Sequence, residues 1–289
     1  MNLRRQACRP IADCPSRKRG LTVGAASWLL VMFALAASAS ASPITIFSGI
    51  DAVASYPTPL PNVDASRAAF NTAVTTGGGT ILLADLEGLG LTSPPNGSHT
   101  DLGAGIGVTL EGTQPASLGF GTGVRTDLNA TTAANPGFGF NTTAGGNQFF
   151  RVITETIAPG ASTHATATFD FVSPIDAFGL TLTGLGEGDG ITATLQFADG
   201  SPQVLTIPGL PVGAGGASGT EATFFGFLAP GAPITSVILD LQYQNINTFN
   251  AEYFVGFDDV TASAAVPEPS SMLLLATGVM GVLRRRRSR

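Results

Sequence analysis

Cysteine is almost missing from this sequence and is confined to its N-terminal stretch. The two cysteines are Cys8 and Cys14, and both precede an apolar run from Leu21 to Ala37. The rest of the chain has no thiol, which excludes disulfides and thiolate metal sites there. A stable fold must therefore come from burial of a hydrophobic core.

Positive charge is scarce in the middle of the chain. Residues 42–266 contain no lysine and three basic residues, Arg67, Arg125 and Arg151, against eighteen acidic residues, which gives a formal charge of −15. Such a surface repels nucleic acid and anionic lipid. It favours cations, neutral sugars or positively charged polymers as partners. The alternative interpretation is that the acidic surface serves solubility alone.

Residues for nucleophilic catalysis are also few. His99 and His164 are the only histidines, both lie near predicted turns, and no Gly-x-Ser-x-Gly elbow occurs. A nucleophile–base triad is therefore not expected, and we interpret both histidines as exposed loop residues. A glycosidase-type site needs two carboxylates at a defined separation. The acidic residues offer many such pairs, so a polysaccharide-modifying enzyme stays the alternative to a protein without enzymatic activity.

The N-terminus has the features of an export signal. A leader with six basic residues precedes the apolar run, and Ala39-Ser40-Ala41 provides a small-residue cleavage site before Ser42. This arrangement predicts a signal peptide over residues 1–41.

The C-terminus consists of three blocks in a fixed order. Val266-Pro267-Glu268-Pro269 comes first, and its prolines predict an extended, exposed strip. Residues 270–283 are almost wholly apolar and would form a helix about 21 Å long, short of the roughly 30 Å hydrocarbon core of a membrane. A cluster of arginines follows and favours a cytoplasmic C-terminus: Arg284, Arg285, Arg286, Arg287 and Arg289.

These three blocks resemble the PEP-CTERM sorting signal, which is also labelled the ice-binding-protein C-terminal domain. The resemblance covers residues 266–289. It implies a Gram-negative bacterium, transient anchoring in the inner membrane through residues 270–283, and cleavage by an exosortase near the Pro-Glu-Pro. It also implies a final place in the cell envelope or the extracellular biofilm matrix. Ice binding rests on the label alone, and the body lacks a Thr-x-Thr ladder of fixed period.

The body, residues 42–265, is predicted to be an all-β antiparallel sandwich of the jelly-roll kind with one short helix. The helix is expected over residues 64–74 with Asp64 as its N-cap. Two parts, residues 42–111 and 148–262, would be joined by a loop-rich stretch with one short edge strand. The predicted strands span residues 44–47, 80–86, 106–111, 149–157, 165–172, 176–183, 191–197, 204–207, 222–228, 234–242 and 253–261.

Alternation supports several of these strands. Ile191, Ala193, Leu195 and Phe197 alternate with polar residues, and Asp199-Gly200 is a hairpin turn signal. Phe169 and Phe171 should point to one face of their strand and Asp170 to the other.

This half of the chain resembles the body of many PEP-CTERM proteins, a jelly-roll sandwich of the carbohydrate-binding-module kind. The segments that carry the resemblance are Asn141–Gly146, Phe169–Gly179, Phe197–Gly200 and Gly256–Val260.

Two binding sites are predicted in the body. Sandwich modules of this kind often hold a structural Ca²⁺ where the first and last strands meet, and Ca²⁺ takes several oxygen ligands. The candidate ligands are Asp51, Asp85, Glu87, Asp258 and Asp259. Adjacent residues of a strand project to opposite faces, so at most one of Asp258 and Asp259 should enter the core. The alternative is a solvated strand end.

A sugar platform is the second predicted site. The body has no tryptophan, so the best candidates flank an amide-rich loop: Tyr243, Gln244, Asn245 and Tyr253. We therefore expect an exported structural or adhesive protein that binds polysaccharide weakly, with exosortase as its processing partner and Ca²⁺ as a candidate staple.

Overall fold

The computed structural model describes the body of the chain in ten stretches, all within the unit formed by residues 41–289. These stretches are residues 43–52, 59–90, 95–112, 122–126, 139–144, 146–153, 163–185, 189–207, 221–243 and 254–264. Within them no helix is long and apolar enough to cross a membrane. The predicted signal peptide and sorting signal lie outside the described residues.

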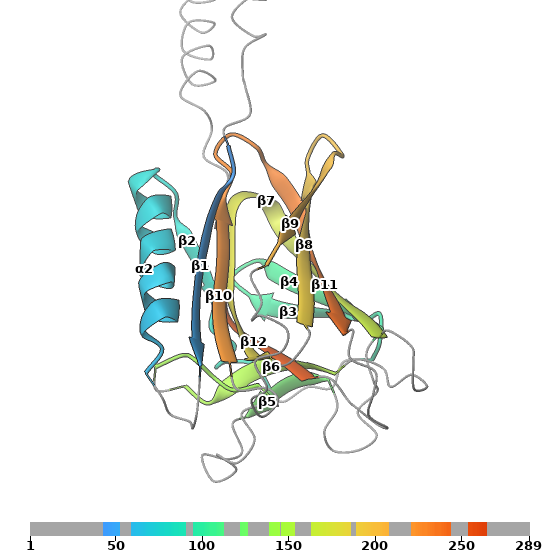
Figure 1. The fold of residues 1–289 in the computed structure, drawn as a ribbon. Helices are drawn as coiled ribbons and strands as arrows, with labels where there is room; N and C mark the ends of the chain where they lie inside the picture. Colours follow the sequence, from blue (N-terminus) through green and yellow to red (C-terminus); the bar gives the residue numbers. More distant parts are fainter. Residues whose placement is uncertain are drawn as a thin grey trace, which may run out of the picture. The chain divides into compact units, whose positions relative to one another are not determined.

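Antiparallel strands dominate, with one α-helix on the outside (Figure 1). The elements are β1 (Thr45–Ala52), α2 (Pro61–Thr76), β2 (Ile81–Ala84), β3 (His99–Gly103), β4 (Ile106–Glu111), β5 (Gly123–Thr126), β6 (Gln148–Ile153), β7 (Thr163–Leu185), β8 (Asp189–Phe197), β9 (Pro202–Thr206), β10 (Glu221–Leu228), β11 (Ile234–Tyr243) and β12 (Phe254–Ala264).

The long strand β7 belongs to both layers of the sandwich. Its first half pairs with β4 and β11, and its second half pairs with β10 and β12. One layer therefore runs β3-β4-β7-β11-β8-β9, and the other contains β1-β10-β7-β12 with β2 and β6 on the far side of β12. Phe169, Leu195 and Leu239 from the first layer and Leu180 and Phe257 from the second join one buried core. The predicted all-β antiparallel sandwich is confirmed.

The sequence predicted two strands, residues 165–172 and 176–183, where the structure has the single strand β7. Val172 is 88% exposed at the point where β7 changes partners. Pro174 lies just beyond it and has no N–H to donate, but proline tolerates an extended backbone. The strand therefore continues through this point from one layer to the other, and the predicted break is wrong.

The alternation in β8 is confirmed. Ile191, Ala193 and Leu195 are buried, and β8 and β9 form the expected antiparallel pair. At the turn between them, Gly200 has φ of 85°, which glycine adopts without strain. The predicted orientation around Asp170 is also confirmed, because Phe169 is buried whereas the Asp170 side chain is 42% exposed.

Helix α2 begins three residues earlier than predicted. Pro61 occupies its first turn, Leu60 is the N-cap residue, and Asp64 makes no capping hydrogen bond. The carboxylate of Asp51 in β1 accepts the backbone N–H groups of Asn62 and Val63, both at 2.9 Å. The prediction of Asp64 as N-cap is therefore wrong, because the cap comes from a neighbouring strand and not from the local sequence.

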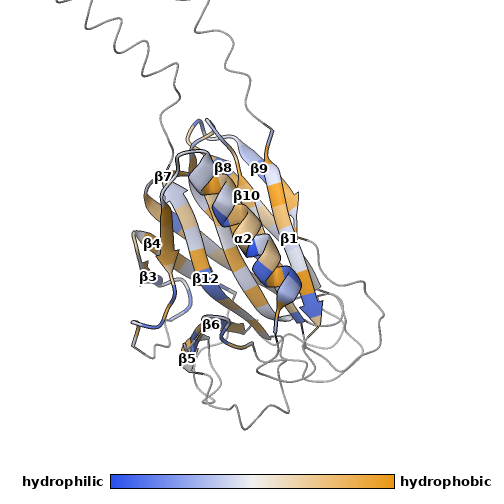
Figure 2. Ribbon diagram, turned by 90° about the vertical axis from the view of Figure 1, so that its left-hand side faces the viewer, coloured by the Kyte–Doolittle hydropathy of each residue, from blue (hydrophilic) through white to orange (hydrophobic). Residues whose placement is uncertain are grey.

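Helix α2 covers the outer face of β1 and β10 (Figures 1 and 2). Val63, Phe70 and Val74 pack with Phe224 of β10 in a second core. Gly49 of β1 lets the helix approach closely, since a Cβ atom there would collide with the carbonyl oxygen of Asn62.

Strand β3 was not predicted, and it moves His99 from a loop to a strand. Nε2 of His99 lies 3.0 Å from Oδ2 of Asp170 in β7. The His99 ring crosses Gly107 of β4, where a Cβ atom would collide with it. His99 is 56% exposed, so its predicted exposure is confirmed but its place in a loop is wrong. His164 lies in β7, and nothing is described of its side chain.

Candidate functional site

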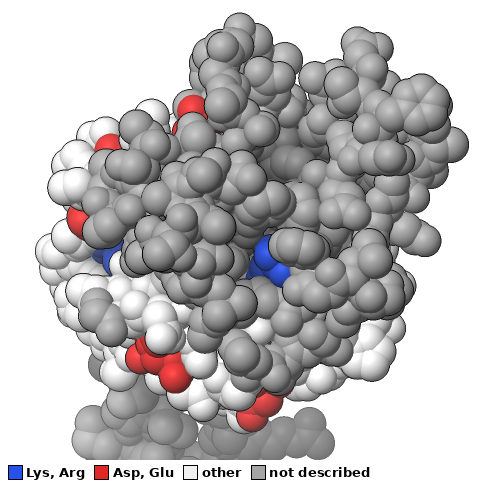
Figure 3. All heavy atoms as spheres, turned by 90° about the horizontal axis from the view of Figure 1, so that it is seen from below, with Lys and Arg blue, Asp and Glu red and all other residues white. Residues whose placement is uncertain are grey.

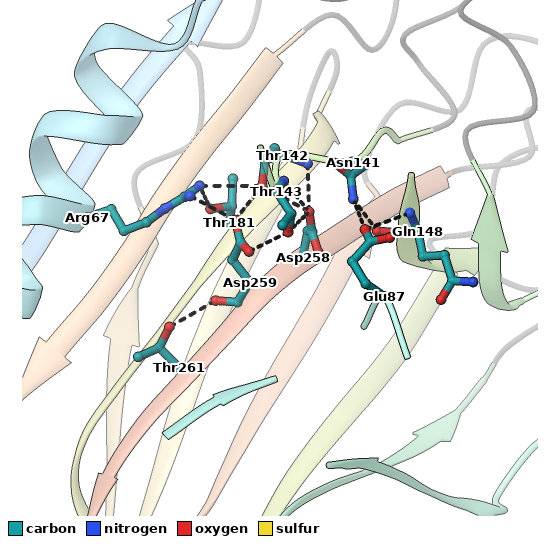
Figure 4. A network of polar contacts seen from close by, with 10 residues as sticks. All are labelled: Arg67, Glu87, Asn141, Thr142, Thr143, Gln148, Thr181, Asp258, Asp259 and Thr261. Atoms are coloured by element: carbon teal, nitrogen blue, oxygen red, sulfur yellow. Dashed lines mark hydrogen bonds and ion pairs between the residues drawn. The ribbon is translucent and has the colours of Figure 1, made fainter. Parts of the chain in front are cut away.

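A buried polar cluster joins three distant segments of the chain (Figure 4). Arg67 comes from α2, Thr142 and Thr143 from residues 139–144, and Asp258 and Asp259 from β12. We call residues 139–144 the strap. Asp258 is fully buried and Asp259 is 4% exposed. Buried carboxylates need partners, and the partners of these two make the cluster the candidate functional site.

A bulge in β12 brings both aspartates to the same set of partners. The register between β12 and β7 shifts between Asp258 and Thr261, and Asp259 has φ of 52°. A non-glycine residue in this left-handed region is strained and needs support from its surroundings. The prediction that at most one of the two carboxylates enters the interior is wrong, because regular alternation does not hold across a bulge.

Asp258 fastens the strap to β12. Its Oδ2 accepts the backbone N–H of Thr142 at 2.6 Å and that of Thr143 at 3.1 Å. The Thr142 hydroxyl lies 3.1 Å from the same oxygen. Oδ1 of Asp258 is buried and has no hydrogen-bond partner among the described residues. All of its partners therefore gather on one carboxylate oxygen.

Asp259 ties helix α2 into the same cluster. Nη1 of Arg67 lies 2.8 Å from Oδ2 of Asp259, and the Thr143 hydroxyl donates to Oδ1 at 2.6 Å. Nη2 of Arg67 donates to the Thr181 hydroxyl of β7 at 2.8 Å. One guanidinium thus connects the helix, the sheet and one of two adjacent carboxylates.

Burial raises the pKa of Asp258 to about 7, and the neighbouring negative charge of Asp259 adds to the shift. The hydrogen bonds from the Thr142 and Asp259 backbone N–H groups act in the opposite direction because they favour the carboxylate. The cluster has two carboxylates and one guanidinium, so full ionisation would leave a buried net negative charge. A proton on Asp258 removes that charge.

Asn141, the residue before Thr142, provides a second anchor for the strap. Nδ2 of Asn141 donates to Oε1 of Glu87 and to the backbone oxygen of Gln148, both at 2.6 Å. Glu87 also accepts the backbone N–H groups of Asn147 and Gln148 at 2.9 Å. The Glu87 carboxylate therefore orders the chain on both sides of residue 145.

The five predicted calcium ligands do not form one site. Asp51 caps α2, Glu87 holds the chain around Gln148, and Asp258 and Asp259 hold the strap and Arg67. Oδ1 of Asp85 accepts the N–H of Glu87 at 3.2 Å. No group of three or more acidic, histidine or cysteine side chains that could hold a metal occurs in the described part of the chain. The described side chains do not bring these five residues together as one ligand set, and Ca²⁺ binding by the body stays a prediction.

The other predicted site residues are not placed by the structure. Tyr243 ends β11, but nothing is described of its side chain, and Gln244, Asn245 and Tyr253 lie outside the described residues. The same holds for Ala39, Ala41 and Ser42 and for the whole sorting signal. The sugar platform stays a prediction.

Sequence reasoning missed Arg67, Thr142 and Thr143 as partners of the aspartates. Their only signal was indirect, because Asn141–Gly146 and Gly256–Val260 are two of the segments that carry the resemblance to other bodies of this kind. The structure brings these two segments into contact through Asp258. The cluster connects parts of the chain, and its two carboxylates are sealed from solvent.

Comparison with protein families matches residues 265–287 to the PEP-CTERM protein-sorting motif. The molecule is therefore an exported all-β protein that passes through the membrane and is processed by an exosortase. The chain carries this sorting motif at residues 265–287, as the resemblance of its C-terminus predicted. Comparison with curated proteins finds no match.

Two solved structures show distant likeness. One is the enzymatically active domain of tailspike protein 4 of bacteriophage CBA120, at 14% identity and a TM-score of 0.30, over 55% of this chain and 19% of the tailspike chain. The other is an endo-1,4-β-D-xylanase 10B from Clostridium thermocellum comprising CBM22-1 and GH10 modules, at 12% identity and a TM-score of 0.26. It covers 61% of this chain and 28% of its own. Scores this low define no shared site or activity.

Proposed function

We propose that the body is a structural or adhesive component of the cell envelope or extracellular matrix, which binds polysaccharide weakly and catalyses no reaction. The observation that carries this proposal is the use of the adjacent carboxylates Asp258 and Asp259. Both are buried, and both hold parts of the fold together through Arg67 and the strap. A glycosidase needs its two carboxylates open to substrate on either side of a glycosidic bond.

The negative charge of the body favours some classes of polysaccharide as ligands over others. Residues 42–266 carry a formal charge of −15. On the face in Figure 3, acidic side chains and some basic ones lie scattered among uncharged ones where the surface is described. Such a surface repels anionic polymers and accepts neutral or cationic ones. Without tryptophan, the body has few rings for stacking on sugars, so binding rests on hydrogen bonds and is weak.

The test uses the processed protein recovered from its host. Its thermal unfolding is measured with neutral, anionic and cationic polysaccharides, each in Ca²⁺ and again in chelator. A ligand that binds only the folded state raises Tm by mass action. The proposal expects a small increase with a neutral or cationic glycan and no new reducing ends after long incubation. Release of reducing ends would contradict it and favour an enzyme. The Ca²⁺ arm separately tests the calcium prediction.

A further inference from the structure

The layer formed by β3, β4, β7, β11, β8 and β9 has an outer face on which no described helix packs. Helix α2 is the only helix among the described residues, and it packs on β1 and β10 of the other layer (Figure 1). Side chains on the outer face reach solvent at both ends and in between. His99 of β3 is 56% exposed, the Asp170 side chain of β7 is 42% exposed, and Val204 of β9 is 62% exposed.

The strand registers align the outward side chains of this layer in rows that cross the strands. In each row, neighbours on adjacent strands lie opposite one another. The middle row contains no acidic and no basic residue other than a histidine at its end, and its members are His99, Thr109, Thr168, Ile238, Thr194 and Val204. Adjacent strands lie about 4.8 Å apart, so this row extends over about 24 Å.

Acidic side chains stand on both sides of the middle row. Neighbouring rows are two residues apart along each strand, which is about 7 Å. The row on one side contains Asp101 and Asp170, on either side of Gly107. The row on the other side contains Glu111 and Asp240, on either side of Thr166. None of these three rows of described residues contains lysine or arginine. A neutral track that carries hydroxyl groups therefore runs between two acidic borders.

We propose that this outer face binds a polysaccharide that carries free amino groups, with the sugar chain lying along the middle row. The ammonium groups of the sugar pair with the carboxylates of the two borders, as charge-assisted hydrogen bonds. Its hydroxyl groups exchange hydrogen bonds with Thr109, Thr168 and Thr194, because a threonine hydroxyl both donates and accepts. Ile238 and Val204 contact the apolar C–H groups of the sugar rings. This inference rests on the proposed function, because it names the class of polysaccharide and the surface that binds it.

The charge of the face favours this ligand over the other candidates. An anionic polysaccharide would be repelled by both borders. A neutral one would use the hydroxyl groups of the middle row and leave the carboxylates without a countercharge. A second copy of the chain would place a body with a formal charge of −15 against another of the same charge.

The test compares two sugars that differ only in charge. The processed protein recovered from its host is titrated with a glucosamine oligosaccharide, at a pH where its amines are protonated, and with the N-acetylated oligosaccharide of the same length. At low salt the glucosamine form should bind at least about tenfold more tightly. The difference should shrink as salt is added, because salt screens exposed charges. Equal affinities at low salt would overturn the proposal.

Two double variants show whether the borders of this face supply the charge. Asp101→Asn with Glu111→Gln removes one exposed carboxylate from each border. It should weaken binding of the glucosamine form roughly three- to tenfold, as expected for exposed charge pairs, and leave the N-acetylated form unaffected. Asp64→Asn with Asp85→Asn removes two exposed carboxylates from α2 and the segment after β2, and should bind as the wild type. An equal loss in both double variants would assign binding to net charge and overturn the face.

A third double variant tests the middle row. Thr168→Val with Thr194→Val keeps the shape of both side chains and removes their hydroxyl groups, so binding of both sugars should weaken. Unchanged binding would overturn the path of the chain along this row.

These outcomes also separate this inference from the function proposed above. If no polysaccharide of any charge binds the wild type, the proposed binding of polysaccharide fails, and this inference fails with it. If polysaccharide binds but ignores the amino groups or the border carboxylates, the proposed function stands and this inference alone is overturned.

Discussion

Arg67 of helix α2 and Asp259 of strand β12 form an ion pair with 2.8 Å between Nη1 and Oδ2. The Asp259 side chain is 6% exposed and the Arg67 side chain is 21% exposed, so water screens the pair little. The same guanidinium contacts Thr181 of β7. This ion pair therefore connects α2, the only helix among the described residues, to β12, the strand that carries the adjacent carboxylates.

Replacing Arg67 by methionine should therefore destabilise the body strongly. The variant keeps much of the apolar stem but leaves Asp259 without its countercharge, and such uncompensated buried charge costs about 3–5 kcal/mol. The free energy of unfolding from urea titration measures the effect.

Asp170→Asn is the matched control for that prediction. It removes the charge from the exposed contact with His99. The side chains of His99 and Asp170 are 56% and 42% exposed, and exposed ion pairs contribute about 0–1 kcal/mol. If Arg67→Met and Asp170→Asn cost the same, the buried cluster does not stabilise the fold as described.

Asp51 is expected to stabilise helix α2 more than Asp64 does. Asp51→Ala removes the acceptor for the N–H groups of Asn62 and Val63, which should cost about 1–2 kcal/mol. Asp64→Ala removes only an acidic side chain in the first turn, worth about 0.3–1 kcal/mol. Unfolding of the two variants by denaturant compares them directly, and a larger loss in Asp64→Ala would show that the cap is local after all.

Gly256→Ala should loosen the strap. A Cβ atom at residue 256 would lie 2.5 Å from the Thr183 hydroxyl and 2.9 Å from Cα of Gly139, so β12 and the strap would have to separate. Overpacking of this kind costs about 1–3 kcal/mol. Faster proteolysis or hydrogen exchange at residues 139–144 is the expected result. Gly88→Ala meets nothing within 4 Å and is the control.

Much of the sandwich could be predicted from the sequence because its strands alternate with period two. Ile191, Ala193 and Leu195 show this pattern and are buried, and the turn at Asp199-Gly200 follows from local chemistry. Strand β3 has no such pattern and forms because β4 offers it a partner. The continuity of β7 through Pro174 could not be predicted either, since a proline in a predicted strand normally indicates that the strand ends there.

The site was less predictable because it depends on contacts between distant segments. The carboxylates of Asp258 and Asp259 were recognised, but the bulge at Asp259 that directs both to one cluster leaves no pattern in the sequence. Asp51 was predicted as a calcium ligand, and only the packing of α2 on β1 shows that it is a helix cap. The C-terminal motif could be predicted from the sequence, because its three blocks lie in one contiguous segment.

The arginines of the sorting signal give a prediction about export. Replacing Arg284, Arg285, Arg286 and Arg287 by glutamine removes the cationic block that favours a cytoplasmic end. Processing should fall, and the protein should accumulate with its C-terminus intact. Immunoblots of host fractions measure this, with Glu111→Gln at an exposed position of β4 as a control outside the signal. Normal processing of the quadruple variant would show that these arginines are not part of what is recognised.

The most direct test of the whole account is the intact mass of the protein recovered from the envelope and extracellular fractions of its native host. An exosortase substrate should lack both the leader before Ser42 and the residues after the Pro267-Glu268-Pro269 strip, so its C-terminus should lie near that strip. If every molecule instead still ends at Arg289, the chain is not processed as its motif requires, and the account of an exported, sorted matrix protein is contradicted.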